Sequence, residues 1–161
     1  MITGFFDLET PKDLLKKLRH DLIQMELHPF DIYLAYNFFV TAEAMLDWIY
    51  PGNQNRKVRT KIRNSEVILQ ITSDLATGAK HFSGLSDIHK SVVKTDISAG
   101  YIPRGYFPKG AFPVGFFGDG MLRVHLDKET TAEDRTTFSA FELASRVLTY
   151  WEEALTSPTD D

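Results

Sequence analysis

A segment in the middle of the chain carries side chains that could transfer protons. Four polar residues are spaced by four, three and four positions, so a helix would place them on one face: Gln70, Asp74, Thr77 and His81. An imidazole beside a carboxylate can act as a general base, and the Lys80 cation next to it suits a phosphate ester. The candidate catalytic residues are therefore His81, Lys80 and Asp74, with a solvated polar helix face as the alternative.

A basic run follows the second predicted helix. Five cations fall within eight residues: Arg56, Lys57, Arg59, Lys61 and Arg63. Such a density of positive charge is typical of a surface that neutralises nucleic-acid phosphates. We expect the run to contribute to RNA binding, with a solvated loop balanced by acidic helices as the alternative.

Residues 100–120 contain a short repeat with an unusual composition. A five-residue unit occurs three times from position 101 to position 115, with Pro at its third position and Gly at its fifth. The prolines exclude a central strand. Aromatic and basic side chains alternate, as in surfaces that stack single-stranded bases, although aromatics tucked into the core are the alternative. The candidate binding residues are Tyr101, Arg104, Tyr106, Phe107 and Lys109.

An acidic pair on the second predicted helix could belong to a metal site. Glu43 and Asp47 lie one helical turn apart, and bundles can hold metals between carboxylates and histidines of facing helices, here Asp74 and His81. The Glu-x-x-His pattern of such bundles is absent, and the five histidines lack metal-ligand spacing. The acidic pair is more typical of a solvent-reaching helix edge, so the sequence predicts no metal and no cofactor.

Helices must position most of these residues. Hydrophobic spacing predicts four of them, at residues 10–28, 32–50, 65–84 and 130–156. The second is apolar on nearly every side, which is typical of a buried central helix. Gly78 lies inside the third, where it costs about 1 kcal/mol relative to Ala. A close approach by the central helix or by a ligand would explain that glycine.

Strands are expected between the third and last helices. Residues 88–97 are rich in Val, Ile and Thr, and residues 121–127 alternate, with Leu122, Val124 and Leu126 on one face. A Gly-Asp-Gly turn at positions 118–120, just before the second of these strands, predicts that residues 114–117 pair with it as a hairpin. The expected fold is α+β, mainly α: a bundle of about four helices with a small antiparallel sheet or hairpin inserted before the C-terminal helix.

Length and composition limit the class of protein. The 161 residues suit one domain, helical over 10–84, with the strands and loop at 85–127 and the last helix at 130–156. The 18 basic and 22 acidic residues exclude a globally basic nucleic-acid binder, and the lack of cysteine excludes disulfides and thiol nucleophiles. Without an apolar run of about 18 residues or a basic signal-like start, we expect a cytoplasmic protein without membrane contact.

One stretch resembles known proteins. Residues 74–82 read Asp-Leu-Ala-Thr-Gly-Ala-Lys-His-Phe and follow an aromatic-rich helix with Asn-Phe-Phe-Val-Thr-Ala at 37–42. This resembles small uncharacterised bacterial helical-bundle proteins and, distantly, the HEPN superfamily, many of whose members are dimeric, metal-independent ribonucleases. The resemblance implies that His81 is catalytic. The family's arginine, four to six residues before its histidine, is replaced here by Leu75, Ala76 and Thr77.

These observations favour a non-enzymatic binding module. The missing arginine fits a catalytically silent relative that binds RNA or a protein partner. We expect a homodimer that uses the aromatic loop and the basic run, because exposed aromatic side chains usually mark an interaction site. The alternative is a HEPN-like metal-independent ribonuclease with His81 as base or acid.

Overall fold

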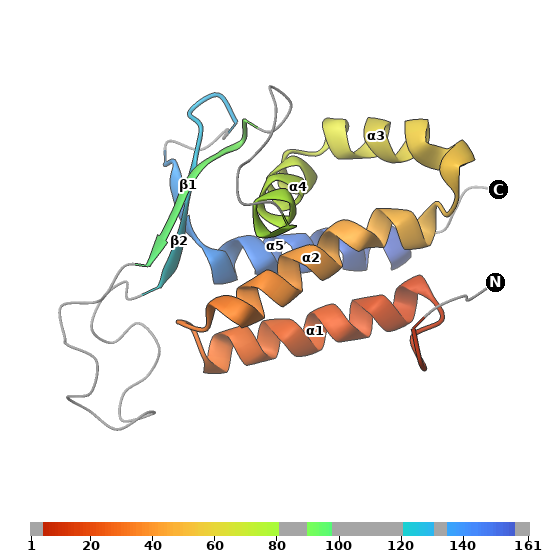
Figure 1. Ribbon diagram of the computed structural model, residues 1–161, viewed down its shortest axis with the longest axis horizontal. Coiled ribbons are helices and arrows are strands. Elements are labelled where there is room, and N and C mark those ends of the chain that lie inside the picture. The colour runs from red at the N-terminus through yellow and green to blue at the C-terminus, as the bar shows by residue number, and fades with distance from the viewer. Residues whose placement is uncertain (1–4, 81–89, 98–120, 131–134, 157–161) are drawn as a thin grey trace.

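The computed structural model describes residues 5–80, 90–97, 121–130 and 135–156. These residues form five α-helices, a short 3-10 turn at Asn53–Asn55 and three strands. The helices are α1 (Pro11–Leu27), α2 (Ile32–Ile49), α3 (Arg56–Ser65), α4 (Val67–Lys80) and α5 (Ala140–Thr156). The strands are β1 (Val92–Ile97), β2 (Leu122–Leu126) and β3 (Thr137–Ser139). The predicted class, α+β and mainly α with the sheet before the last helix, is confirmed (Figure 1).

The first helix begins and ends where the sequence predicts. Thr10 accepts a hydrogen bond from the backbone of Asp13, whose carboxylate accepts one in return, so the two residues form a capping box. Pro11 occupies the first turn, and the helix ends at Leu27, before Pro29. Helix α1 packs against α2 and α5 (Figure 1), and its buried side chains join the core.

Helix α2 corrects the expectation of a helix buried on all sides. Its middle is buried, with Phe38 and Met45 fully inside. Its first two turns are exposed instead: Tyr33 is 73% exposed, and Ile32 and Tyr36 are about half exposed. Apolar composition alone does not distinguish a core contact from a surface one: Ile32 and Tyr36 line a cleft, whereas Leu34 and Ala35 of the same turns pack against the core.

Helices α3 and α4 depart from prediction in three ways. No helix was expected where α3 lies, because its apolar positions, Val58 and Ile62, are few among cations. The apolar spacing predicts that the helix at residues 65–84 buries a stripe at positions 68, 71, 75, 79 and 82. The buried face of α4 is rotated from that stripe and consists of Leu69, Ile71, Thr72, Ser73 and Ala76. Nothing among the described residues lies within 4 Å of a Cβ built on Gly78, so the expected close approach of the central helix is wrong.

The sheet has the order β1-β2-β3 and is antiparallel throughout. Residues 121–127 alternate as predicted, since Val124 and Leu126 are buried toward the helices. The partner found for β2 is β1, with a bulge between Val92 and Lys94; residues 114–117 and the predicted strand start at 88–89 lie outside the described residues.

The predicted start of the last helix is wrong. Residues Thr137–Ser139 pair with β2 as β3, and α5 begins only at Ala140. β-branched and aromatic residues favour a strand here, and the Ser139 hydroxyl accepts from the backbone N–H of Glu142 (3.0 Å), which caps the new helix.

Within the described ranges, no helix combines the length and the hydropathy that crossing a lipid bilayer requires.

Candidate functional site

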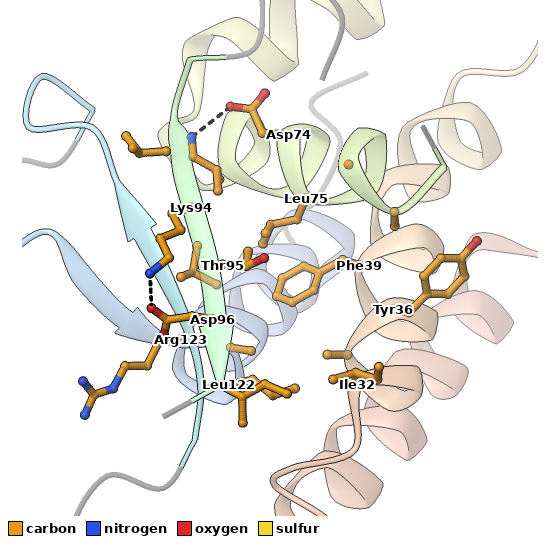
Figure 2. Close-up of a pocket in the computed structure, with 18 of the residues that line it drawn as sticks. Ile32, Tyr36, Phe39, Asp74, Leu75, Lys94, Thr95, Asp96, Leu122 and Arg123 are labelled. Atoms are coloured by element: carbon orange, nitrogen blue, oxygen red, sulfur yellow. Dashed lines mark hydrogen bonds and ion pairs between the residues drawn. The ribbon is translucent and has the colours of Figure 1, made fainter. Parts of the chain in front are cut away.

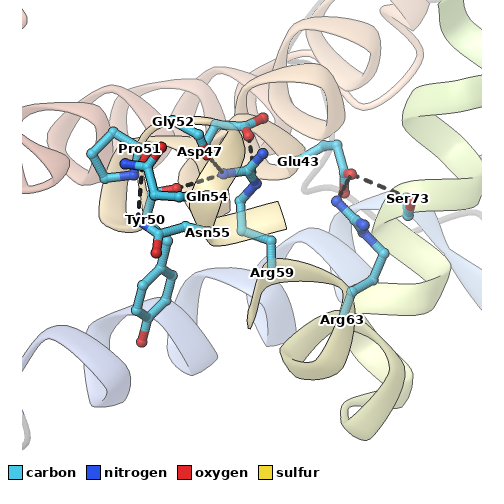
Figure 3. Close-up of polar contacts among 10 residues, drawn as sticks. All are labelled: Glu43, Asp47, Tyr50, Pro51, Gly52, Gln54, Asn55, Arg59, Arg63 and Ser73. Atoms are coloured by element: carbon cyan, nitrogen blue, oxygen red, sulfur yellow. Dashed lines mark hydrogen bonds and ion pairs between the residues drawn. The ribbon is translucent and has the colours of Figure 1, made fainter. Parts of the chain in front are cut away.

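Two residues of the basic run attach α3 to α2. Arg63 forms an ion pair with Glu43 (2.6 Å), and Arg59 forms one with Asp47 (2.8 Å). Figure 3 shows both arginine side chains reaching from α3 toward the carboxylates of α2. The Arg59 guanidinium also donates to the carbonyl of Tyr50 at 2.6 Å, so it satisfies the C-terminal end of α2.

The expected RNA-binding run is therefore divided between two roles. Arg59 and Arg63 are only partly exposed and are engaged with α2. Arg56, Lys57 and Lys61 lie on the exposed face of α3. A phosphate-binding patch built from the described part of this run would rest on those three cations alone.

Glu43 joins α2 to both α3 and α4. Its carboxylate accepts from Arg63 and, at 3.3 Å, from the Ser73 hydroxyl of α4. Burial raises the pKa of the Glu43 carboxyl above 4.5, although the neighbouring Arg63 acts in the opposite direction. The Nε of Arg63 is itself buried and has no hydrogen-bond partner among the described residues. This pattern is typical of a structural ion pair rather than of a metal site.

Asp74, a predicted catalytic residue, holds the beginning of β1. One of its carboxylate oxygens accepts from the backbone N–H groups of Ser91 (2.7 Å) and Val92 (3.2 Å). Lys80 is exposed at the end of α4, and His81 lies outside the described residues. A catalytic pairing of Asp74 with His81 thus stays a prediction, while a structural role for Asp74 is evident.

The aromatic loop also lies outside the described residues. This covers all five of its predicted binding residues: Tyr101, Arg104, Tyr106, Phe107 and Lys109.

A cleft of about 600 Å³ opens between the sheet and the helices. Its walls are the first turns of α2, the last turns of α4 and the strand β1. Figure 2 shows Phe39 and Leu75 inside it, with Ile32 and Tyr36 on the α2 side. Gly78 lines the cleft too, which leaves open the expected explanation that a ligand approaches this glycine.

The exposed start of α2 continues this apolar cleft onto the surface. Five apolar side chains at the α1–α2 turn are between 43% and 73% exposed and form what we call the tip patch: Leu27, Phe30, Ile32, Tyr33 and Tyr36. A second cavity of about 260 Å³ lies between this turn and the sheet and shares Leu122 and Ala140 with the cleft. The tip patch therefore lies at the same end of the helices as the two cavities.

Polar side chains cover the opposite face of the sheet. Asp96 accepts from Lys94 (2.8 Å), and the His125 ring lies 3.1 Å from Asp96 and 3.1 Å from the Thr137 hydroxyl. The hydrogen bond from Lys94, and secondarily that from His125, lowers the pKa of Asp96. Within the described ranges, no cluster of three or more His, Asp or Glu side chains could hold a metal ion.

The sequence did not predict the tip patch, because the helix at residues 32–50, which carries Ile32, Tyr33 and Tyr36, was expected to be buried, and no prediction was made for Leu27 and Phe30. A signal was available: five aromatic residues follow Pro29 within ten positions, at 30, 33, 36, 38 and 39, more than one helix face can bury.

Comparison of the sequence with protein-family models, with curated proteins and with solved structures finds no match.

Proposed function

We propose that this protein is a non-enzymatic interaction module that acts as a homodimer and binds a protein partner at the tip patch and the adjoining cleft. The observation that carries this proposal is the exposure of Leu27, Phe30 and Tyr33 beside a cleft lined by further apolar groups. Exposed apolar side chains gathered at one turn beside a cleft are characteristic of protein-binding sites.

A protein partner is favoured over RNA by the chemistry of this surface. The tip patch carries apolar and tyrosine side chains, which predominate in the centre of protein interfaces. The basic run suits RNA less well, because Arg59 and Arg63 are engaged with the carboxylates of α2. RNA binding through Arg56, Lys57 and Lys61 is the competing outcome of the test below.

The test is photo-crosslinking in cells from a reactive side chain placed at position 33. The control places the same group at Lys12, which is exposed at the other end of α1. That helix has 17 residues and is about 25 Å long, so the control lies far from the tip patch. We expect one discrete protein adduct at position 33 and none at position 12. Adducts with RNA, or equal adducts at both positions, would contradict the proposal.

The ribonuclease alternative has its own control. If His81 is a catalytic base or acid, His81→Ala abolishes RNA cleavage by the purified chain. If the protein is an interaction module, the unchanged chain does not cleave single-stranded RNA above the background rate, and His81→Ala gives the same result.

A further inference from the structure

The outer edge of β1 carries a sequence that is complementary to itself. On either side of Thr95, Lys94 and Asp96 bear opposite charges, and Val93 and Ile97 are both aliphatic. Those two aliphatic side chains are 70% and 50% exposed. Among the described strands, β1 has a neighbour on one side only, which is β2.

Hydrogen bonding along β2 determines which β1 residues face it. The N–H of Asp127 donates, at 3.0 Å, to the carbonyl just before β1. Successive residues of a strand direct their backbone groups to alternate sides, so His125 and Arg123 also direct theirs toward β1. Their register partners are Lys94 and Asp96, which therefore use their own N–H and C=O groups to pair with β2.

Thr95 and Ile97 alternate with those residues, so their backbone N–H and C=O groups point away from β2. An exposed row of such groups can pair with a strand of another chain. The carboxylate of Asp96 can accept a further hydrogen bond from a second chain. Its bonds to Lys94 and His125 both use Oδ2, and no described residue bonds to Oδ1.

We propose that two copies of this chain pair through β1, antiparallel and about a two-fold axis at Thr95, joining two three-stranded sheets into one of six strands. Lys94 then lies opposite the partner's Asp96, and the exposed Val93, which belongs to the bulge, lies near the partner's Ile97. The inference rests on the proposed function in one respect only, since it supplies the interface of the homodimer assumed there.

The charges of Lys94 and Asp96 favour the register in which Thr95 lies opposite the Thr95 of the second copy. With Thr95 opposite its own copy, Lys94 and the partner's Asp96 occupy a non-hydrogen-bonded position, where facing side chains come closest. A slip of two residues would set Lys94 against the partner's Lys94, or Asp96 against the partner's Asp96. Like charges directly opposite one another are destabilising, so the alternatives are disfavoured.

The symmetry has a consequence for the cleft. A two-fold axis perpendicular to the sheet leaves both copies' helices on the same face of it. Because β1 forms one wall of the cleft, the two clefts lie side by side across the axis and form one larger apolar surface. Thr95 and Ile97 line it near the axis.

The test exchanges charges across the interface and measures the dimer dissociation constant by sedimentation equilibrium of the full chain. We expect the unchanged chain to dimerise and Lys94→Glu or Asp96→Lys alone to weaken the dimer at least tenfold, because each sets two like-charged pairs opposite one another. An equal mixture of the two variants restores opposite charges at both positions and should dimerise. Lys128→Glu, an equal change of charge at an exposed site beyond β2, is the matched control and should have no effect.

A third interface variant leaves Asp96 unchanged, because Asp96 also contacts His125 within its own sheet. The N–H of Thr95 points outward, so Thr95→Pro removes no β1–β2 hydrogen bond but blocks pairing at the axis. We expect a folded monomer by circular dichroism and sedimentation.

The outcomes separate this inference from the proposed function. A dimer that tolerates all three variants forms through another surface, which overturns the β1 pairing but leaves a homodimeric module. A wild-type chain that stays monomeric at about 100 μM overturns both dimers. The crosslink at position 33 tests partner binding independently of either result.

Discussion

Arg63 of α3 and Glu43 of α2 form a 2.6 Å ion pair, and Arg59 and Asp47 repeat it one turn along both helices at 2.8 Å. The two helices are therefore joined by a double arginine–carboxylate contact whose spacing follows the helical repeat. Two residues that the sequence suggests for phosphate binding thus connect two helices of the fold.

Arg63→Met tests that structural role. The substitution keeps much of the apolar stem but leaves the largely buried Glu43 carboxylate without its cation, so we expect a loss of about 2 kcal/mol of unfolding free energy in urea. Lys61→Met on the exposed face of α3 is the control and should change stability by less than about 0.5 kcal/mol. Equal effects of the two substitutions would show that the pair contributes nothing.

Glu43→Gln tests the electrostatics of the same contact. The pKa of Glu43 is raised in the folded protein above the ordinary value of 4.5, so the folded state holds this proton more tightly than the unfolded chain. The stability of the wild type relative to Glu43→Gln should therefore be greatest below pH 4.5 and fall as pH rises through the raised pKa. Urea unfolding of both proteins between about pH 4 and about pH 8 measures this difference. A difference that stays constant or rises with pH would exclude a raised pKa.

Thr10→Ala tests the capping box of α1. The Thr10 hydroxyl, and next Lys16, lowers the pKa of Asp13 from 3.8 to about 2. The stabilisation linked to this carboxylate is present above pH 3.8 and is lost as pH falls toward 2. Removing the hydroxyl should raise the Asp13 pKa toward 3.8, as followed by carbon NMR, and should destabilise the protein by about 1 kcal/mol. An unchanged Asp13 titration would contradict the capping geometry.

Two glycines should respond in opposite directions to alanine. Gly78→Ala should stabilise the protein by about 1 kcal/mol, because the residue is helical and its added methyl group meets nothing within 4 Å among the described residues. Gly52→Ala should destabilise it by about 1–3 kcal/mol, because Gly52 has φ of +86° and the new Cβ would lie 2.5 Å from the Gln54 side chain. Thermal unfolding of both variants checks the signs, and a common sign would contradict one of the two geometries.

The parts of the fold that the sequence predicts are those governed by local signals. A capping box and Pro11 mark the start of α1, and alternation marks β2. Elements that depend on tertiary partners were missed. Helix α3 has few apolar residues of its own and is held by arginine pairs to α2, while β3 exists because Thr137 and Phe138 pair with β2.

The candidate site was harder to predict because it also depends on contacts between residues far apart in the sequence. Asp74 lies on the expected helix, but its role depends on the backbone at Ser91, 17 positions along the chain. Tyr33 and Tyr36 are aromatic residues within an apolar helix, so the sequence suggests that they are buried. They are exposed because no other described element covers them. Hydropathy reports the tendency of a side chain to be buried, and it does not report whether the fold or a partner buries it.

The most direct test of the central claim, that the tip patch serves a partner rather than the fold, is a calorimetric titration of the purified chain with the protein that crosslinks at position 33. We predict that Tyr33→Ser weakens binding at least tenfold while the unfolding free energy changes by less than about 0.5 kcal/mol. Unchanged affinity, or a loss of affinity matched by a loss of stability, would contradict it.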